Sequence, residues 1–161
     1  MTKSTNYKTH EEYMKQAIVE AKKAGQNGEV PIGAILVADN GEVLSSEYNR
    51  TISLCDPSAH AEILALREAG NKIKNYRLLN TILYVTVEPC IMCMGAVIYA
   101  RIERVVFGTF DPKGGAAGSL YNFAEDKRLN HRTGIISGIC EEECRSLIRE
   151  FFKARRVNSE S

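Results

Sequence analysis

The sequence has no apolar run long enough to cross a membrane. The longest mostly apolar stretch, residues 91–100, is far shorter than the roughly 20 residues that a membrane-spanning helix needs. The first sixteen residues, MTKSTNYKTHEEYMKQ, also lack the apolar centre of a secretory signal peptide. We therefore expect a cytoplasmic protein.

The chain also has little net charge and no segment that marks a domain boundary. Its formal charge is +1 over 161 residues, so any contact with nucleic acid must come from a local patch. No repeat, linker or low-complexity segment divides it. The length suits one hydrophobic core. We predict a single domain over residues 1–161, with frayed ends at about 1–7 and 157–161.

The five cysteines do not have the spacing of a disulfide framework. In a reducing compartment such residues are core residues, metal ligands or nucleophiles. Cys55 lies in an expected loop, and Cys140 and Cys144 have the spacing of a partly buried helix face. Cys90 and Cys93 are the two candidates for a functional role.

Hydrophobic periodicity predicts helices that alternate with strands. Asp39-Asn40-Gly41 is a tight-turn signal, Gly25 and Gly70 are expected to end helices, and Asp56-Pro57 is expected to cap one. Such alternation is typical of a sheet covered on both faces. We predict an α/β fold, a three-layer α/β/α sandwich with a central, mainly five-stranded mixed sheet. The expected helices are 11–24, 59–69, 89–101 and 141–156, with a short helical piece before residue 129, and the expected strands are 32–38, 42–49, 81–87, 104–109 and 134–139.

Two short motifs stand where expected helices begin. One is His60-Ala61-Glu62, and the other is Pro89-Cys90-Ile91-Met92-Cys93. Cys90 and Cys93 are three residues apart, so one helical turn presents both sulfurs on one face, and a helix N-terminus favours the thiolate form. With the His60 imidazole they make three ligands of the types that zinc prefers, and the sequence offers no comparable fourth. An open fourth position is typical of catalytic zinc.

Glu62 is the candidate proton carrier beside such a metal. Residues two apart on a regular helix point to different sides, so His60 and Glu62 can meet one ion only if it lies in front of the helix end. Taken singly, the His or the Glu is more often structural, and a CxxC pair also occurs in redox sites and structural zinc sites. Together, H-x-E followed by P-C-x-x-C is the signature of zinc-dependent nucleobase deaminases.

Beyond these motifs, residues 8–156 resemble the bacterial tRNA-specific adenosine deaminases, within the cytidine deaminase superfamily. The segments that carry the resemblance are EVPIGAILV, DPSAHAEILALREA, NYRL, LYVTVEPCIMCMGAVIYARI, VVFGTFDPKGGAAGSL, LNHR and FFKARR. The resemblance implies hydrolytic deamination of the wobble adenosine in a tRNA anticodon stem-loop to inosine, one Zn²⁺ per subunit, and a homodimer. It also implies that Glu62 moves protons from water to the base and to departing ammonia, that Asn49 and the Ala61 N–H contact the base, and that Asp111 lies near the substrate strand.

The last expected helix carries a basic stripe. Arg145, Arg149, Lys153 and Arg156 recur at helical spacing opposite an apolar face. Such a stripe is more often a solvated surface than a nucleic-acid site, and here the resemblance favours RNA phosphates. The helix predicted over 89–101 is apolar on almost every side, and Met92, Met94 and Tyr99 indicate surface that a dimer partner would cover.

Two alternatives are left open by the sequence. The same zinc signature fits a deaminase of guanine or of another free base or nucleotide, which an activity panel distinguishes. A noncatalytic, zinc-stabilised RNA-binding module would instead fill the fourth metal position and have no use for Glu62.

Overall fold

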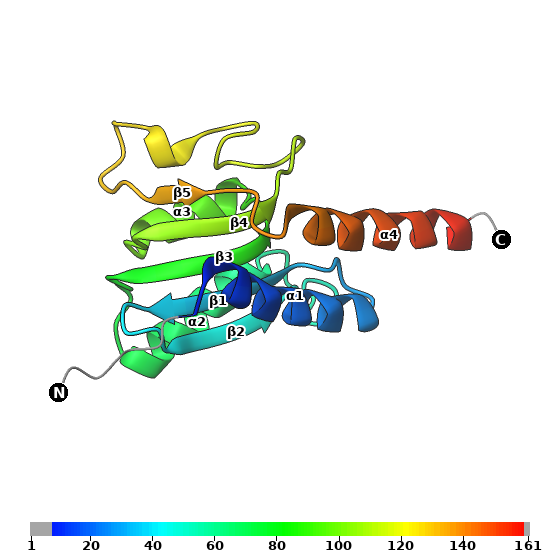
Figure 1. Ribbon diagram of the computed structural model, residues 1–161, viewed down its shortest axis with the longest axis horizontal. Coiled ribbons are helices and arrows are strands. Elements are labelled where there is room, and N and C mark those ends of the chain that lie inside the picture. Colours follow the sequence, from blue (N-terminus) through cyan, green and yellow to red (C-terminus); the bar gives the residue numbers. More distant parts are fainter. Residues whose placement is uncertain (1–7, 160–161) are drawn as a thin grey trace.

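The computed structural model describes residues 8–159, which form a five-stranded sheet with helices on both faces (Figure 1). The strands follow the order β2 (Val43–Tyr48), β1 (Gly33–Ala38), β3 (Thr81–Val87), β4 (Arg104–Thr109) and β5 (Gly134–Ile136). β1 is antiparallel to both of its neighbours, β2 and β3, whereas β3, β4 and β5 run parallel to one another. The predicted three-layer sandwich with a mixed sheet is therefore confirmed.

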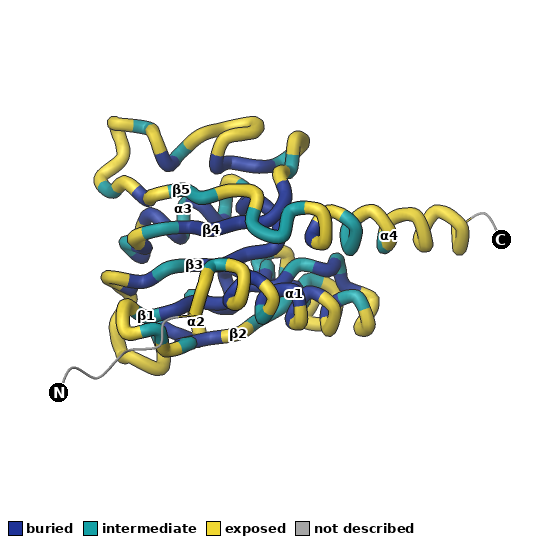
Figure 2. The backbone as a smooth tube through the Cα atoms, viewed as in Figure 1, coloured by how far each residue is buried: buried dark blue, intermediate teal, exposed yellow. Residues whose placement is uncertain are grey.

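Two apolar cores lie on the two faces of the sheet. Helices α1 (His10–Gln26) and α4 (Glu141–Ser159) pack on one face, and α2 (Ala61–Ile73) and α3 (Ile91–Tyr99) pack on the other. Successive side chains of β3 serve the two cores in turn, with Leu83 and Val85 on the α2/α3 side and Tyr84 on the α1 side. Because both faces are covered, β3 and β4 stay almost wholly buried, as Figure 2 shows.

Helix α2 begins later than the sequence predicts. It starts at Ala61 and not at residue 59, with His60 as its N-cap. Asp56 does not cap it, because the Asp56 carboxylate accepts hydrogen bonds from the N–H and hydroxyl of Ser58 in a turn before the helix. Gly70 does not end it either, since the helix continues to Ile73 and stops at Lys74 in the left-handed conformation.

Other element ends differ by a few residues. Gly25 lies inside α1, which a Thr9–Glu12 capping box begins. β5 has only three residues, and the short helical piece is the 3-10 turn η1 (Phe123–Glu125). α4 continues to Ser159 and so includes residues 157–159, where the sequence predicts fraying, and the remaining residues of the predicted frayed ends, 1–7 and 160–161, lie outside the described part. The far half of α4 projects past the sheet (Figure 1).

The strand directions bring several chain segments to one edge of the sheet. β3 and β4 run in parallel, with Val87 paired to Thr109, so Glu88 and Phe110 leave the sheet side by side. β1 runs the opposite way, and Gly33 pairs with Tyr48, which places Asn49 at the same edge. In the described residues, no helix combines the length and apolar character of a membrane span.

Candidate active site

His60, Cys90 and Cys93 meet at this edge of the sheet. His60 Nδ1 lies 3.6 Å from Cys90 Sγ and 3.5 Å from Cys93 Sγ. One donor atom from each residue lies within 4.8 Å of the others, and residues 8–159 contain no other such group of three His, Cys or acidic side chains. Zinc in proteins binds nitrogen at about 2.0 Å and sulfur at about 2.3 Å, so donors this close can share one ion. The structure brings together the three predicted ligands.

The backbone at two helix starts presents these donors. His60 and Cys90 are the N-caps of α2 and α3, both with extended φ and ψ, and neither side chain makes a capping hydrogen bond. Their side chains turn instead toward the third donor, Cys93, in the first turn of α3. Because His60 stands outside the helical turn that holds Glu62, the two residues can face one point in front of α2, as the sequence argument requires.

The environment of the cluster favours a thiolate. Hydrogen bonds from Cys93 and His60 lower the pKa of Cys90 to about 4, against the opposing effect of burial. The hydrogen bond with Cys90 and burial raise the pKa of Cys93, and the hydrogen bond to Cys90 raises the pKa of His60. The thiolate is the form of cysteine that binds metal ions, so the lowered pKa of Cys90 suits a role as a metal ligand.

Glu62 is a buried carboxyl with an unused oxygen. It is 3% exposed, burial raises its pKa, and its Oε1 has no hydrogen-bond partner. Asn49 Oδ1, at the same edge, is also buried and without a partner. A buried acceptor of this kind costs about 1–3 kcal/mol, which a bound ligand can recover. The donor set and these two oxygens fit a zinc ion with a substrate beside it.

The other predicted substrate contacts lie around the cluster. Asn49 follows β2 and donates its backbone N–H to Ile32. Ala61 is the first residue of α2, where a helix leaves its N–H groups without an internal partner. Asp111 follows β4, and its Oδ1 accepts the backbone N–H groups of Lys113 and Gly114.

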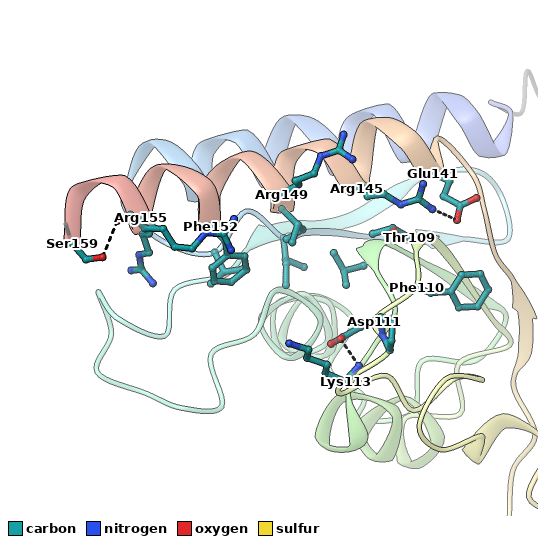
Figure 3. A pocket seen from close by; sticks show the side chains of 16 residues that line it. Thr109, Phe110, Asp111, Lys113, Glu141, Arg145, Arg149, Phe152, Arg155 and Ser159 are labelled. Carbon is teal, nitrogen blue, oxygen red and sulfur yellow. Dashed lines mark hydrogen bonds and ion pairs between the residues drawn. The ribbon is translucent and has the colours of Figure 1, made fainter. Parts of the chain in front are cut away.

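A pocket of about 1070 Å³ lies between the segment after β4 and the inner side of α4 (Figure 3). The metal-binding group does not line it, but Val87 and Thr109 at the ends of β3 and β4 do. Three of the four predicted stripe residues line this pocket, and Lys153 does not. Arg155 also lines the pocket, although the sequence did not predict this. Arg155 was missed because it lies one residue away from the helical spacing of the predicted stripe. The lining side chains that bear on substrate binding are Phe110, Asp111, Arg145, Arg149, Phe152, Arg155 and Arg156.

Acidic neighbours already occupy two arginines of this pocket. Arg145 pairs with Glu141 at 2.8 Å and with Glu142 at 3.1 Å, and Arg149 pairs with Glu142 at 3.3 Å. All four side chains are substantially exposed, and such pairs contribute only about 0–1 kcal/mol each. An incoming phosphate can therefore compete for both guanidinium groups.

Comparison with known proteins places this arrangement in a family. Residues 7–109 match the cytidine and deoxycytidylate deaminase zinc-binding region. A tRNA-specific adenosine deaminase of Bacillus subtilis (strain 168) is 49% identical over 144 residues, which cover 89% of each chain. A similar protein of Haemophilus influenzae is 47% identical over 146 residues, covering 91% of this chain and 84% of the relative.

Solved structures agree with this placement. A chain from a study of A-to-I editing by tRNA:A34 deaminases at the wobble position has a TM-score of 0.82 and 44% identity, covering 84% of this chain and 98% of its own. A guanine deaminase from Nitrosomonas europaea has a TM-score of 0.76 but 23% identity, with 88% and 83% covered, and it supports the fold alone. The chain accordingly belongs to the tRNA-specific adenosine deaminases, within the zinc-binding cytidine and deoxycytidylate deaminase family.

Proposed function

We propose that this zinc-dependent deaminase converts the wobble adenosine of a tRNA anticodon loop to inosine by hydrolysis. The observation that carries the proposal is the His60, Cys90 and Cys93 cluster with the buried Glu62 carboxyl beside it, whose Oε1 has no hydrogen-bond partner. The substrate class is supported by the named activity of relatives that are 47–49% identical over most of the chain.

The residues divide the chemistry between binding and proton transfer. His60, Cys90 and Cys93 would hold one Zn²⁺ per subunit, which when bound supplies a water molecule with a pKa lowered toward about 7. Glu62 accepts one proton of the attacking water and delivers it to a ring nitrogen of adenine. It then takes the second water proton from the oxygen now bonded to C6 and passes it to the amine, which leaves as ammonia. Water supplies the oxygen of inosine. Burial raises the pKa of Glu62, and a carboxyl with a raised pKa suits a group that accepts and donates protons in one cycle.

The base is held by the Asn49 side chain and by the first N–H of α2. The Asn49 amide is buried at the end of β2, with its Oδ1 free to accept from the base. The N–H of Ala61, in the first turn of α2, is a donor of the kind that helices offer to ligands. Both groups belong to segments that converge at the carboxyl end of β3.

The pocket beside α4 is the proposed site for the rest of the anticodon loop. Single-stranded RNA is held by guanidinium contacts to phosphates and by stacking of bases on aromatic rings. Phe110 and Phe152 are 44% and 42% exposed, and Arg149 and Arg156 line the same pocket. These residues form the local basic patch that RNA binding requires in a chain whose net charge is only +1.

We also propose a homodimer that covers part of α3. Met94 is fully buried within the subunit and makes no part of this surface, whereas Ile91 and Tyr99 are 52% and 78% exposed. Tyr99 and Tyr76 also line a pocket of about 830 Å³ between α2 and α3. The solution mass at micromolar concentration tests the proposal: wild type should run as a dimer and Tyr99→Glu as a monomer. A monomeric wild type would overturn it.

The function is tested with an unmodified tRNA that carries a wobble adenosine. We expect inosine at that position in the intact tRNA and in its anticodon stem-loop, with no turnover of free adenosine, cytidine or guanine. Turnover of guanine without inosine in RNA would move the protein to the free-base deaminases. RNA binding without turnover of any of these substrates, by a zinc-loaded protein, would favour the noncatalytic module.

A further inference from the structure

Glu88 is a buried carboxylate with no part in the proposed chemistry. It lies at the carboxyl end of β3, two residues before Cys90, and is 3% exposed. It does not belong to the group that can hold a metal ion. Burial of an ionisable group is costly unless its oxygens are well hydrogen-bonded, so the partners of Glu88 indicate its role.

All of the side-chain hydrogen bonds made by Glu88 come from one segment, the glycine-rich loop of residues 111–119. Oε1 accepts the N–H of Asp111 at 3.1 Å and the hydroxyl of Ser119. Oε2 accepts the N–H groups of Ala117 and Ser119, both at 3.0 Å. Each oxygen has two donors, which is the capacity of an ionised carboxylate.

The loop is shaped to reach this carboxylate. A Cβ atom on Gly115 would overlap the Glu88 carboxylate, so the loop backbone lies directly against it. Gly115 also forms an isolated antiparallel β-bridge with Cys90, and the N–H of Ala116 donates to the carbonyl of Pro89 at 2.8 Å. The loop is thus bound along the Glu88-Pro89-Cys90 segment, and its first residue is Asp111, which lines the pocket beside α4.

We propose that Glu88 is a positioning residue for tRNA: it fixes the 111–119 loop against the Cys90 segment and so holds Asp111 in place at the substrate site. This inference rests on the proposed function for its substrate. The helix starts of α2 and α3 present the three candidate metal ligands and Glu62, and among these residues the loop pairs only with the backbone of Cys90. Loss of the Glu88 carboxylate should therefore weaken RNA binding and leave zinc content and the chemical step nearly unchanged.

Glu88→Gln tests this with almost no change of shape. One oxygen becomes an NH₂ group that faces loop donors, so two hydrogen bonds are lost and a donor–donor conflict appears. The matched control is Glu29→Gln, because Glu29 is also buried and accepts the N–H groups of Ile52 and Ser53 in a different loop. Hydrogen exchange should accelerate by about tenfold or more at Asp111, Ala117 and Ser119 in Glu88→Gln, and only at Ile52 and Ser53 in the control.

Kinetics with the anticodon stem-loop give the second readout. For Glu88→Gln we expect KM to rise by about tenfold, with single-turnover rates at saturating RNA and zinc stoichiometry close to wild type. Combining it with Asp111→Ala should add little beyond the larger single effect, because both changes act through Asp111. If Glu88→Gln does not fold, Ser119→Ala removes one donor from an exposed residue and should give a smaller change of the same kind.

The outcomes separate this inference from the proposed function. Unchanged exchange over residues 111–119, or a loss in the single-turnover rate with unchanged KM, would overturn the positioning role. A wild-type protein that forms no inosine in RNA would overturn the proposed function. In that case the hydrogen-exchange measurement still decides whether Glu88 holds the loop, but the proposed role of Glu88 in tRNA binding is overturned.

Discussion

The metal-binding cluster and the C-terminal helix place their functional groups in opposite ways. His60, Cys90 and Cys93 are wholly or partly buried and are aimed by the backbone at two helix starts. Most of α4 is exposed, and two of its arginines, Arg145 and Arg149, reach out on long side chains that pair with neighbouring glutamates. Chemistry needs groups held within a fraction of an ångström, whereas attraction of phosphates tolerates loose positions.

The difference predicts unequal consequences of mutation. A change in the cluster removes a position that no other residue can fill. A change in α4 removes one of several charges that act through a shared field and are screened by salt.

Cys90→Ala is expected to abolish both zinc binding and activity. It removes the sulfur whose pKa is lowered to about 4 and leaves only two protein ligands. Metal analysis after dialysis, together with inosine formation, measures the effect. Cys55→Ser is the control, since Cys55 is exposed and outside the cluster, and it should keep both properties. Full zinc content in Cys90→Ala would show that the cluster is not the metal site.

Glu62→Gln is expected to separate activity from metal binding. The variant should keep zinc and fold but lose about 10²- to 10⁴-fold in the single-turnover rate, the range typical of general acid–base catalysis. The rate is measured at saturating anticodon stem-loop beside the zinc stoichiometry. Loss of zinc together with activity would mean that Glu62 supports the metal, and a near-normal rate would remove its proposed role.

Neutralising two arginines in the α4 pocket is expected to have a moderate, salt-dependent effect. Arg149→Gln with Arg156→Gln should weaken tRNA binding and reduce the slope of log affinity against log salt by about 0.7–0.9 per lost contact. Lys153→Gln is the comparison, because Lys153 is on the same helix but does not line the pocket. Equal losses of tRNA affinity at Lys153 and at the arginines would indicate that the basic stripe attracts RNA through its overall charge and not through the pocket. An unchanged salt slope in all variants would indicate that the stripe is a solvated surface.

Glu47→Gln is expected to produce the smallest effect, on stability alone. Burial and the nearby Glu68 carboxyl raise the pKa of Glu47 to about 7 from 4.5. Because the folded chain holds this proton more tightly, its stabilising contribution is present below about pH 4.5 and is lost as the pH rises through about 7. Between about pH 4.5 and 7 the free energy of unfolding should fall less in the variant than in wild type. The difference should be about 1 kcal/mol or less, because the group is partly exposed.

Chemical unfolding at several pH values measures this difference. Comparison with wild type cancels the pH dependence that both proteins share at the metal site. Glu42→Gln is the control, since Glu42 is exposed and only ion-paired with Lys72 at 3.5 Å, and it should follow wild type. A pH profile for Glu47→Gln identical to wild type would show that Glu47 titrates as an ordinary carboxyl.

Local signals in the sequence were sufficient for most of the sheet and for the two deaminase motifs. The strands 81–87 and 104–109 are buried on both faces, so a continuous apolar run marked their bounds. Within each motif, H-x-E at 60–62 and P-C-x-x-C at 89–93, residue types and spacing indicate zinc chemistry, whereas the meeting of the two motifs is a tertiary contact. Helix ends were less predictable, because the Asp56 carboxylate binds Ser58 in a turn before α2 and Gly70 lies inside α2, which continues to Ile73.

The fold class, the family and the candidate metal donors follow from residue patterns along the chain. The folded arrangement adds that His60 stands outside α2, that Arg155 and not Lys153 lines the pocket, and that Glu88 receives the glycine-rich loop. Each of these depends on contacts between segments far apart in the chain: His60 meets residues thirty positions away, and Glu88 meets Ser119 across thirty-one. Periodicity and spacing record only what neighbours along the chain do, so contacts made by the packing of separate elements leave no local signal.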